Sequence, residues 1–133
     1  MSISRFGVSL DEDVLKALES YVIDNNFANR SQAIRHLVEE NTVTKKWQCN
    51  NIVAGDVVIM YDHHKSDIIT KSNEIQHQYF DAILSSQHFH LSHDNCIEII
   101  AIKGEAAKLT ELSDKLIGIK GIIRGKLVMS KAS

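Results

Sequence analysis

Residues 83–102 have the sequence ILSSQHFHLSHDNCIEIIAI, and this stretch decides the fold of the second half of the chain. Polar and apolar residues alternate over residues 83–92 and again over residues 96–102, which is the side-chain period of a β-strand. The short segment between the two runs is rich in residues that favour turns. We therefore expect two neighbouring antiparallel strands joined by a tight turn.

The segments on either side of these strands alternate between helix and strand. Apolar residues recur at helical spacing over residues 65–80 and 105–118, whereas residues 57–60 and 121–129 have the composition of strands. The predicted order, β-α-β-β-α-β, is that of a ferredoxin-like sandwich. The expected fold class is therefore α+β, with a ferredoxin-like (ACT-like) domain over residues 52–133.

The first 48 residues predict one strand followed by two helices. Apolar residues occupy every second position from Phe6 to Leu10, so residues 3–10 have the period of a strand. A unit of this size is too small for an independent core, and its single strand has no partner within it. We therefore expect residues 1–48 to form a two-fold dimer in which strand 3–10 pairs antiparallel with its copy.

The other face of this strand carries Arg5, Gly7 and Ser9. A two-stranded ribbon fits the major groove of DNA, where Arg5 could form two hydrogen bonds with guanine and Ser9 could contact several bases. The alternative is that the same residues solvate the outer face of a strand that joins the C-terminal sheet. Periodicity alone does not choose between these interpretations.

The two helices have recognisable starts. Asp11 can cap the first helix, and Ser31 can cap a second one that runs to about Trp47. Asn29 and Arg30 precede Ser31, and free N–H groups beside an arginine suit a phosphate of DNA. Plain helix capping explains the same residues equally well.

The composition places limits on function. With 44% apolar and 24% charged residues in a chain of 133, the protein is typical of a globular domain. Its net charge of −2 gives no support for non-specific binding to nucleic acid, so DNA binding has to rest on a local arrangement. No apolar stretch approaches the roughly 20 residues of a membrane helix, and the start lacks the features of a signal peptide. We expect a cytoplasmic protein with no membrane partner, no small-molecule substrate and no disulfide between Cys49 and Cys96.

The strongest functional signal is a set of four possible metal ligands, His77, His88, His90 and Cys96. His88 and His90 point to the same side of a strand, and a nearby cysteine favours a metal site over an ordinary surface role. His77, near the end of a predicted helix, is a weaker candidate on spacing alone. Three imidazoles and one thiolate suit zinc as a tetrahedron, or copper(II) and nickel(II) in a plane, and spacing does not choose among these metals.

The turn between the strands decides whether the cysteine joins the histidines. A two-residue loop would pair His93 with Cys96 and put the cysteine on the opposite face of the sheet. A three-residue loop would pair Ser92 with Cys96 and keep all these ligands on one face. The metal hypothesis therefore predicts the three-residue turn, which also sets Glu98 opposite His90, where a carboxylate could orient a ligand ring.

The remaining candidate ligands have weaker patterns. His93 is expected to belong to the turn. His63 and His64 open a helical region and are either surface residues or a second, weaker metal site. Cys49 has no possible ligands beside it in the sequence, and we expect it to be inert.

Two parts of the chain resemble known families. The segment RFGVSL at residues 5–10, followed by NRSQAIR at residues 29–35, resembles the ribbon-helix-helix repressors. The segment HFHLSHDNCIE at residues 88–98, together with that N-terminus and the β-α-β-β-α-β order, resembles the nickel-responsive regulator family, NikR. The second similarity covers nearly the full length of the chain.

This resemblance implies a nickel-sensing transcriptional repressor that controls nickel uptake or other nickel-related genes. His88, His90 and Cys96 would come from one subunit and His77 from a neighbour, forming a planar site with one Ni²⁺ per subunit. The implied partners are double-stranded operator DNA and further copies of the chain. The copies would form a dimer of dimers, a homotetramer with its metal-binding domains at the centre.

The resemblance also assigns contacts with DNA. Arg5 and Ser9 match base-reading positions of the ribbon, and Lys65 matches a position that touches the DNA backbone. Gly7 replaces a polar base reader, so the operator sequence or the affinity is expected to differ. Ser66 replaces a basic residue that often follows Lys65, which is expected to weaken phosphate contact.

A second cation site is not expected. Gln32 and His36 stand where acidic residues hold such a cation in some members of the family, and hard cations prefer anionic oxygen ligands.

Three other functions compete with this interpretation. A zinc hydrolase would need an open coordination position and a general base, for which Glu98 is the nearby candidate. An antitoxin would use its C-terminal part to bind a toxin, but residues 52–133 have the pattern of a packed domain. A repressor could instead respond to copper or to a small molecule. A metal titration in the presence of operator DNA separates these alternatives.

Overall fold

The structure, a computed structural model, describes residues 2–133 of the chain. These residues divide into two compact units, one ending at Asn41 and the other running from Thr42 to Ser133. The division falls inside helix α2 (Arg30–Gln48). Among the described residues, no helix is both long and apolar enough to cross a membrane.

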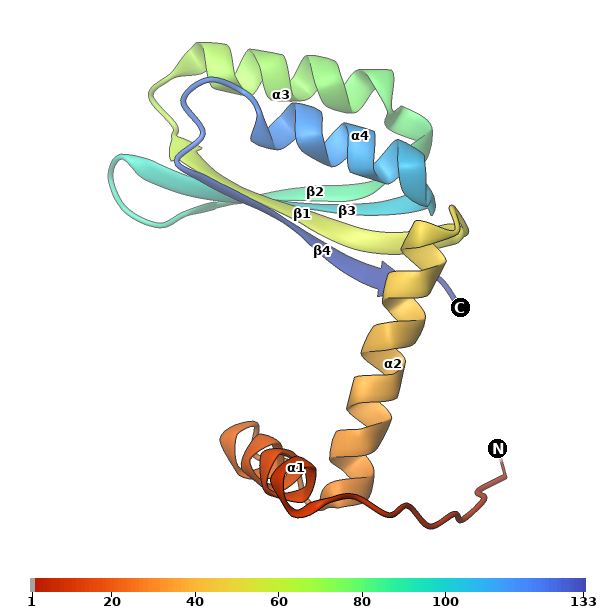
Figure 1. The fold of residues 1–133 in the computed structure, drawn as a ribbon. Coiled ribbons are helices and arrows are strands. Elements are labelled where there is room, and N and C mark those ends of the chain that lie inside the picture. The colour runs from red at the N-terminus through yellow and green to blue at the C-terminus, as the bar shows by residue number, and fades with distance from the viewer. Residues whose placement is uncertain (1) are drawn as a thin grey trace. The chain divides into compact units, whose positions relative to one another are not determined.

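The N-terminal unit consists of an extended arm and two helices (Figure 1). Helix α1 (Glu12–Asp24) begins after Asp11, whose carboxylate accepts a hydrogen bond from the Val14 amide at 2.9 Å, as predicted. Residues 2–10 form neither helix nor strand in the single chain, and all of them are exposed. A strand needs a partner, so the pairing expected for residues 3–10 stays a prediction.

Helix α2 starts at Arg30, two residues earlier than a cap at Ser31 would give. Its cap is Asn29, because Oδ1 of Asn29 accepts from the Gln32 amide at 2.9 Å. The Gln32 side chain in turn accepts from the amide of Ala28, the residue before the cap, at 2.6 Å. The prediction that Ser31 caps this helix is therefore wrong, since Ser31 already lies in its first turn.

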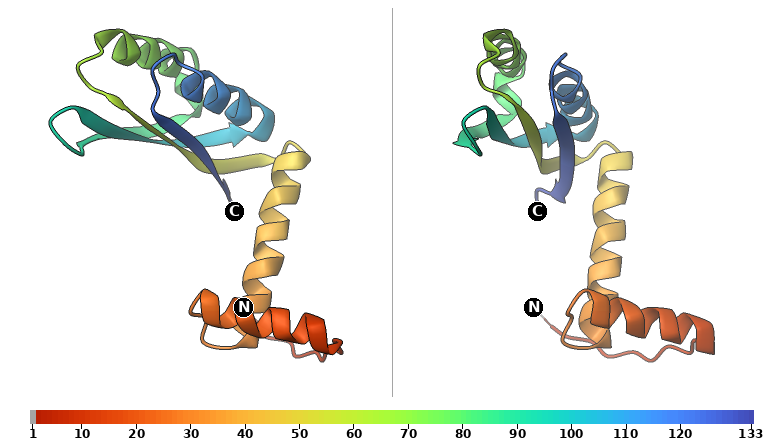
Figure 2. Two further views of the ribbon diagram at one scale, coloured as in Figure 1. Left: turned by 60° about the vertical axis from the view of Figure 1, so that its left-hand side comes forward. Right: turned by 90° about the vertical axis from the view of Figure 1, so that its left-hand side faces the viewer.

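The C-terminal unit has the predicted β-α-β-β-α-β order. Its elements are β1 (Ile52–Asp62), α3 (Ser66–Gln78), a short 3₁₀ helix η1 (Phe80–Ala82), β2 (Ile83–His90), β3 (Asn95–Glu105), α4 (Ala106–Ile117) and β4 (Arg124–Lys131). The strands form one antiparallel sheet in the order β2-β3-β1-β4. Both helices of this unit cover the same face of the sheet, and Figure 2 shows this layering from two further sides.

The core of this unit lies between the helices and the covered face of the sheet. Alternate residues of β1 and β3 are buried there, and α3 and α4 contribute the facing apolar side chains; the buried set includes Val53, Val57, Ile59, Tyr61, Ile68, Ile100, Ile102, Leu109, Leu112 and Leu116. Trp47 also packs on this unit, where its indole N–H donates to the Ser130 carbonyl at 2.8 Å. A Cβ at Gly55 would lie 2.5 Å from the Val128 oxygen and against the Trp47 ring, so only glycine fits this close approach.

The register of the β2–β3 hairpin differs from the prediction by two residues. His90 lies opposite Cys96, and His88 lies opposite Glu98, so the three-residue turn with Ser92 opposite Cys96 is wrong. The loop closes earlier because the amides of Leu91 and Ser92 both donate to the Asn95 carbonyl, at 2.9 and 3.2 Å. Since the side-chain period of a strand is two, a shift of two residues leaves every side chain on its expected face.

Candidate metal centre

Three of the four predicted metal ligands lie on one face of the sheet. His88 and His90 come from β2 and Cys96 from β3, and cross-strand partners point to the same side. Cys96 is buried, with 4% of its surface exposed, because α3 and α4 cover this face. The side chain of His88 is 49% exposed, since β2 is the edge strand. The cluster therefore combines a buried sulfur with imidazoles that are open to solvent.

Glu98 is the buried charged residue at the centre of this region. Its carboxylate is only 1% exposed, and a buried charge has to be hydrogen-bonded to be tolerated. Four side chains supply those bonds: Tyr61 at 3.3 Å, Ser72 at 3.5 Å, Gln76 at 2.8 Å and Ser86 at 2.5 Å. Because Ser72 and Gln76 belong to α3, this network ties the helix to the two strands that carry the ligands.

Glu98 also orients the first strand histidine. Oε2 of Glu98 lies 3.4 Å from Nε2 of His88, so this carboxylate faces the ring of a predicted ligand. The ring is that of His88 rather than His90, because the register places Glu98 opposite His88. Glu98 is the predicted carboxylate, but it contacts the ring of His88, two positions before the predicted His90.

Tyr61 is the second polar neighbour of His88. Its hydroxyl lies 3.2 Å from Nδ1 of His88 and donates to Glu98. Burial raises the pKa of Tyr61 well above its ordinary value, with the nearby charge of Glu98 as the next cause. The phenol therefore keeps its proton and remains a donor. A hydroxyl has one proton, so a Tyr61 that donates to Glu98 can bond Nδ1 of His88 only in the tautomer that carries a proton on Nδ1.

The fourth predicted ligand, His77, is exposed on α3. Its neighbour Gln76 is the residue that faces Glu98. Successive residues of a helix differ in direction by about 100°, so the two side chains leave α3 in different directions. Within residues 2–133, the groups of three metal-ligating side chains whose donor atoms lie within 4.8 Å of one another include none of the four predicted ligands. One copy of the chain thus does not bring this ligand set together.

Sequence reasoning missed the residues that hold Glu98. Tyr61, Ser72, Gln76 and Ser86 are ordinary residue types for a strand or a helix, and their spacing carries no metal-site pattern. Only Tyr61 could have been found from the sequence, because the register of β1 and β3 places it opposite Cys96, a predicted ligand.

The residues predicted to contact DNA are exposed. Arg5, Gly7 and Ser9 lie in the arm of residues 2–10, and the space around Gly7 is open. Lys65 directly precedes α3, and its side chain makes no cap hydrogen bond there.

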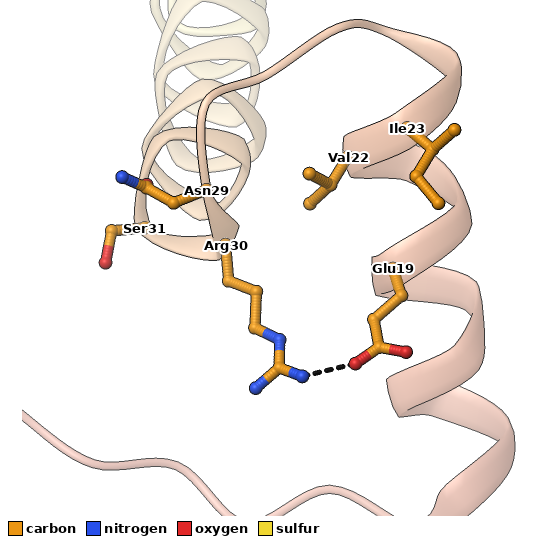
Figure 3. Close-up of a pocket in the computed structure, with 6 residues that line it drawn as sticks. All are labelled: Glu19, Val22, Ile23, Asn29, Arg30 and Ser31. Carbon is orange, nitrogen blue, oxygen red and sulfur yellow. Dashed lines mark hydrogen bonds and ion pairs between the residues drawn. The ribbon is translucent and has the colours of Figure 1, made fainter.

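The start of α2 lines a pocket of the N-terminal unit. Figure 3 shows Asn29, Arg30 and Ser31 on one side of it and α1 residues on the other. Arg30 forms an ion pair with Glu19, and the side chain of Asn29 caps the helix. The dashed line in Figure 3 marks the ion pair between Arg30 and Glu19.

Comparison with known proteins shows which family this domain belongs to. The family model of the NikR C-terminal nickel-binding domain matches residues 54–130, which contain all four predicted ligands. The chain belongs to the NikR family. NikR relatives include a protein of Syntrophus aciditrophicus that is 45% identical, with the match covering 96% of this chain and 93% of the relative. A relative in Chlorobium phaeobacteroides is 42% identical over 98% of this chain and 97% of its own. The names of both describe them as nickel-responsive regulators.

NikR membership settles the class of protein. The family consists of transcriptional regulators, so the chain is not an enzyme and the zinc-hydrolase alternative is excluded. An uncharacterized protein of Thermotoga maritima has a similar structure, with a TM-score of 0.53 and 21% identity. That match covers 59% of this chain and 98% of the other, and it shows a shared fold alone.

Proposed function

We propose that the chain is a nickel-responsive repressor that binds double-stranded operator DNA when nickel is bound by His77, His88, His90 and Cys96. The observation that carries the proposal is the shared face of His88, His90 and Cys96 beside a buried carboxylate. In this proposal the protein works in the cytoplasm and controls genes of nickel uptake or nickel use. Neither a membrane nor a small-molecule substrate takes part.

The donor set fits nickel. Imidazole nitrogen and thiolate sulfur suit nickel(II), and nickel takes planar four-ligand arrangements that a pair of adjacent strands can provide. Both ring nitrogens of His88 have a partner, Nδ1 the Tyr61 hydroxyl and Nε2 the Glu98 carboxylate, so a metal bound by His88 would replace one of these contacts. A bound nickel would supply the charge that holds the Cys96 sulfur as a thiolate. His90, opposite Cys96 in the register, would complete the donors of one chain.

The missing fourth donor points to an assembly of copies. His77 is exposed on its own chain, so a neighbouring copy can supply it, with one Ni²⁺ per subunit. The sheet face that α3 and α4 leave uncovered carries the apolar side chains of Phe89 and Val128, each 47% exposed. Exposed apolar patches of this kind are typical of association surfaces. We propose a homotetramer built as a dimer of dimers.

The N-terminal unit supports the dimeric half of this assembly. Its apolar side chains line a groove of about 400 Å³ formed by Phe6, Val8, Leu10, Val14, Ala17, Leu18, Tyr21, Ile34 and Leu37. A second arm that paired with residues 3–10 would fill such a groove and would give the ribbon its missing strand. The ribbon would then present Arg5, Gly7 and Ser9 to the major groove of DNA.

Nickel would control DNA binding through helix α3. Lys65 precedes this helix and His77 lies near its end. Ser72 and Gln76, which lie between these two residues in the helix, both donate hydrogen bonds to Glu98. A nickel ion that engages His77 would hold α3 in one position and, with it, Lys65 against the DNA backbone. An ion shifts such an equilibrium only by its differential affinity, and couplings of about 1–3 kcal/mol are typical.

A DNA-binding assay with four metals tests the proposal. Operator binding is measured by fluorescence anisotropy with nickel, copper, cobalt and zinc, and absorption spectra are recorded for each metal. We expect nickel to increase the affinity about 5–150-fold, and we expect His88→Ala to remove that increase. Cys96→Ala should remove the sulfur-to-nickel charge-transfer band, whereas Cys49→Ala, at an exposed cysteine, should keep it. Equal affinity with and without nickel would remove the nickel mechanism, and a response to copper alone would reassign the signal.

A further inference from the structure

Helix α3 carries His77 near its C-terminal end, and this helix lies beside α4 on the sheet (Figure 1). His77 is exposed, so the packing of its own side chain does not fix the direction of the imidazole. That direction follows instead from the rotation of α3 about its axis, because successive residues of a helix differ by about 100°. The proposed function needs this imidazole in the nickel site of a neighbouring copy, so the contacts that set the rotation of α3 affect nickel binding.

One contact that sets this rotation faces the sheet. Gln76 donates to the buried carboxylate of Glu98 at 2.8 Å and to the Ser72 hydroxyl at 3.0 Å. Gln76 directly precedes His77, and Ser72 lies one turn earlier, so these bonds hold one side of the C-terminal half of α3. A helix that is held along one side can still roll about that line. A second contact in another direction prevents the roll.

Tyr79, the C-cap residue of α3, supplies the second contact. It is buried, and its hydroxyl donates to Oε1 of Glu111 on α4 at 2.7 Å. Its ring also faces Lys115, one turn further along α4, whose Nζ lies 5.1 Å from the ring centroid. Glu111 and Lys115 pair with each other at 3.4 Å. Two charged groups of α4 therefore hold the phenol.

The bond between Tyr79 and Glu111 is charge-assisted. It is the first cause that lowers the pKa of the Glu111 carboxyl below its ordinary value, and the bond from Lys115 is the second. Glu111 thus accepts as a carboxylate at neutral pH, and bonds to a charged acceptor are stronger than bonds between neutral groups. The turn after α3 has one further link to α4, the ion pair of Asp81 with Lys108 at 2.6 Å. Both of its side chains are exposed, and exposed ion pairs contribute little.

Given the proposed function, on which this inference rests, we propose that Tyr79 is a positioning residue of the nickel site. Its hydroxyl, bonded to Glu111, fixes the rotation of α3 and with it the direction of His77. Gln76 bonds toward the sheet and Tyr79 toward α4, so the two contacts flank His77 in the sequence and leave the helix in different directions. A neighbouring copy then receives an imidazole that is already in place, and preorganised donors lose less conformational entropy on binding.

The nickel affinity of single variants tests this role, measured on the full-length chain by competition with a chelator of known affinity. Tyr79→Phe keeps the ring beside Lys115 but removes the hydroxyl, and it should weaken nickel about two- to ten-fold, the range of one hydrogen bond. Glu111→Leu removes the acceptor and should weaken nickel to the same extent. Glu111→Gln keeps an amide oxygen as the acceptor and should bind nickel as the wild type does. Asp81→Asn breaks only the exposed ion pair and is the matched control, which should also keep the affinity.

A double variant separates positioning from a general loss of stability. If Tyr79 acts through His77, Tyr79→Phe should weaken nickel no further in a chain that already carries His77→Ala, whereas a loss of stability would weaken nickel in both backgrounds. Amide hydrogen exchange of the metal-free chain provides a second readout. The last turn of α3 should exchange faster in Tyr79→Phe than in the wild type. Circular dichroism checks the fold of each variant.

The outcomes separate this role from the nickel proposal itself. Wild-type affinity in Tyr79→Phe, together with a loss in His77→Ala, would overturn the role of Tyr79 and leave the nickel proposal standing. An equal loss in Asp81→Asn, equal exchange of α3 in Tyr79→Phe and wild type, or a further loss from Tyr79→Phe in the His77→Ala background would overturn it as well. Unchanged affinity in His77→Ala would count against the nickel proposal and against the role of Tyr79 with it.

Discussion

The two compact units of this chain differ in how far a single copy can bury its own side chains. The unit from Thr42 to Ser133 closes a continuous core between one sheet face and two helices. In the described part of the unit that ends at Asn41, Ala33 alone is buried, while Phe6 is 78% and Val8 59% exposed. The unit from Thr42 to Ser133 can therefore be stable by itself, whereas we expect the stability of the unit that ends at Asn41 to depend on self-association and thus on protein concentration.

The largest effect expected from this contrast is in the core. Ile59→Ala removes a fully buried side chain and should lower the free energy of unfolding by about 2–5 kcal/mol. Leu37→Ala, at a side chain that is 48% exposed in one copy, should leave that free energy nearly unchanged and instead weaken self-association. Urea unfolding followed by the fluorescence of Trp47, with sedimentation for association, checks both results. Equal losses of unfolding free energy in the two variants would show that the two units do not differ in how far one copy buries its side chains.

Two glycines provide the next comparison. Gly55→Ala would place a Cβ 2.5 Å from the Val128 oxygen and against Trp47, so we expect a loss of about 1–3 kcal/mol. Gly7→Ala meets no atom within 4 Å and should change stability by less than about 0.5 kcal/mol. Thermal unfolding of both variants is the measurement. A stable Gly55→Ala chain would mean that β4 and the end of α2 do not pack as described.

Replacing the buried carboxylate of Glu98 tests whether the hydrogen bonds of the core influence the proposed nickel site. Glu98→Gln replaces an acceptor of four hydrogen bonds by an amide that also donates, so nickel affinity should fall roughly 10–100-fold. Glu111→Gln is the control, because Glu111 is an exposed carboxylate bonded to Tyr79 and Lys115. Competition with a chelator of known affinity gives both values. An unchanged affinity in Glu98→Gln would show that the network supports α3 without acting on the ligands.

The same contrast explains what the sequence could predict. Periodicity gave the element order of the C-terminal unit because each of its strands and helices buries one face within the chain. It also placed His88, His90, Cys96 and Glu98 on one face. That placement holds in the structure because a register shift of two residues leaves each side chain on the same face of the sheet. The register itself was missed because it depends on which amides close the loop at Asn95, a choice that composition does not encode.

The network around Glu98 was missed for a related reason. Its hydrogen-bond partners come together only when α3 packs on the sheet; they are Ser72, Gln76 and Ser86. The spacing of these residues along the chain does not predict that contact. In the N-terminal unit the strand of residues 3–10 stays a prediction, because the partner expected for it is a second copy of the chain.

The smallest expected effect concerns the start of α2. Asn29→Ala removes the side chain that caps the helix and should lower the stability of the N-terminal unit by about 1 kcal/mol. Ser31→Ala changes a residue inside the first turn and should leave stability unchanged or slightly higher, since alanine favours helix more than serine does. Far-ultraviolet circular dichroism during thermal unfolding, at one fixed protein concentration, compares the two. If Ser31→Ala proved the more costly change, the helix would begin at the position that the sequence suggested. Arg30 would then precede the helix, and its pairing with Glu19 would no longer lie in the first turn.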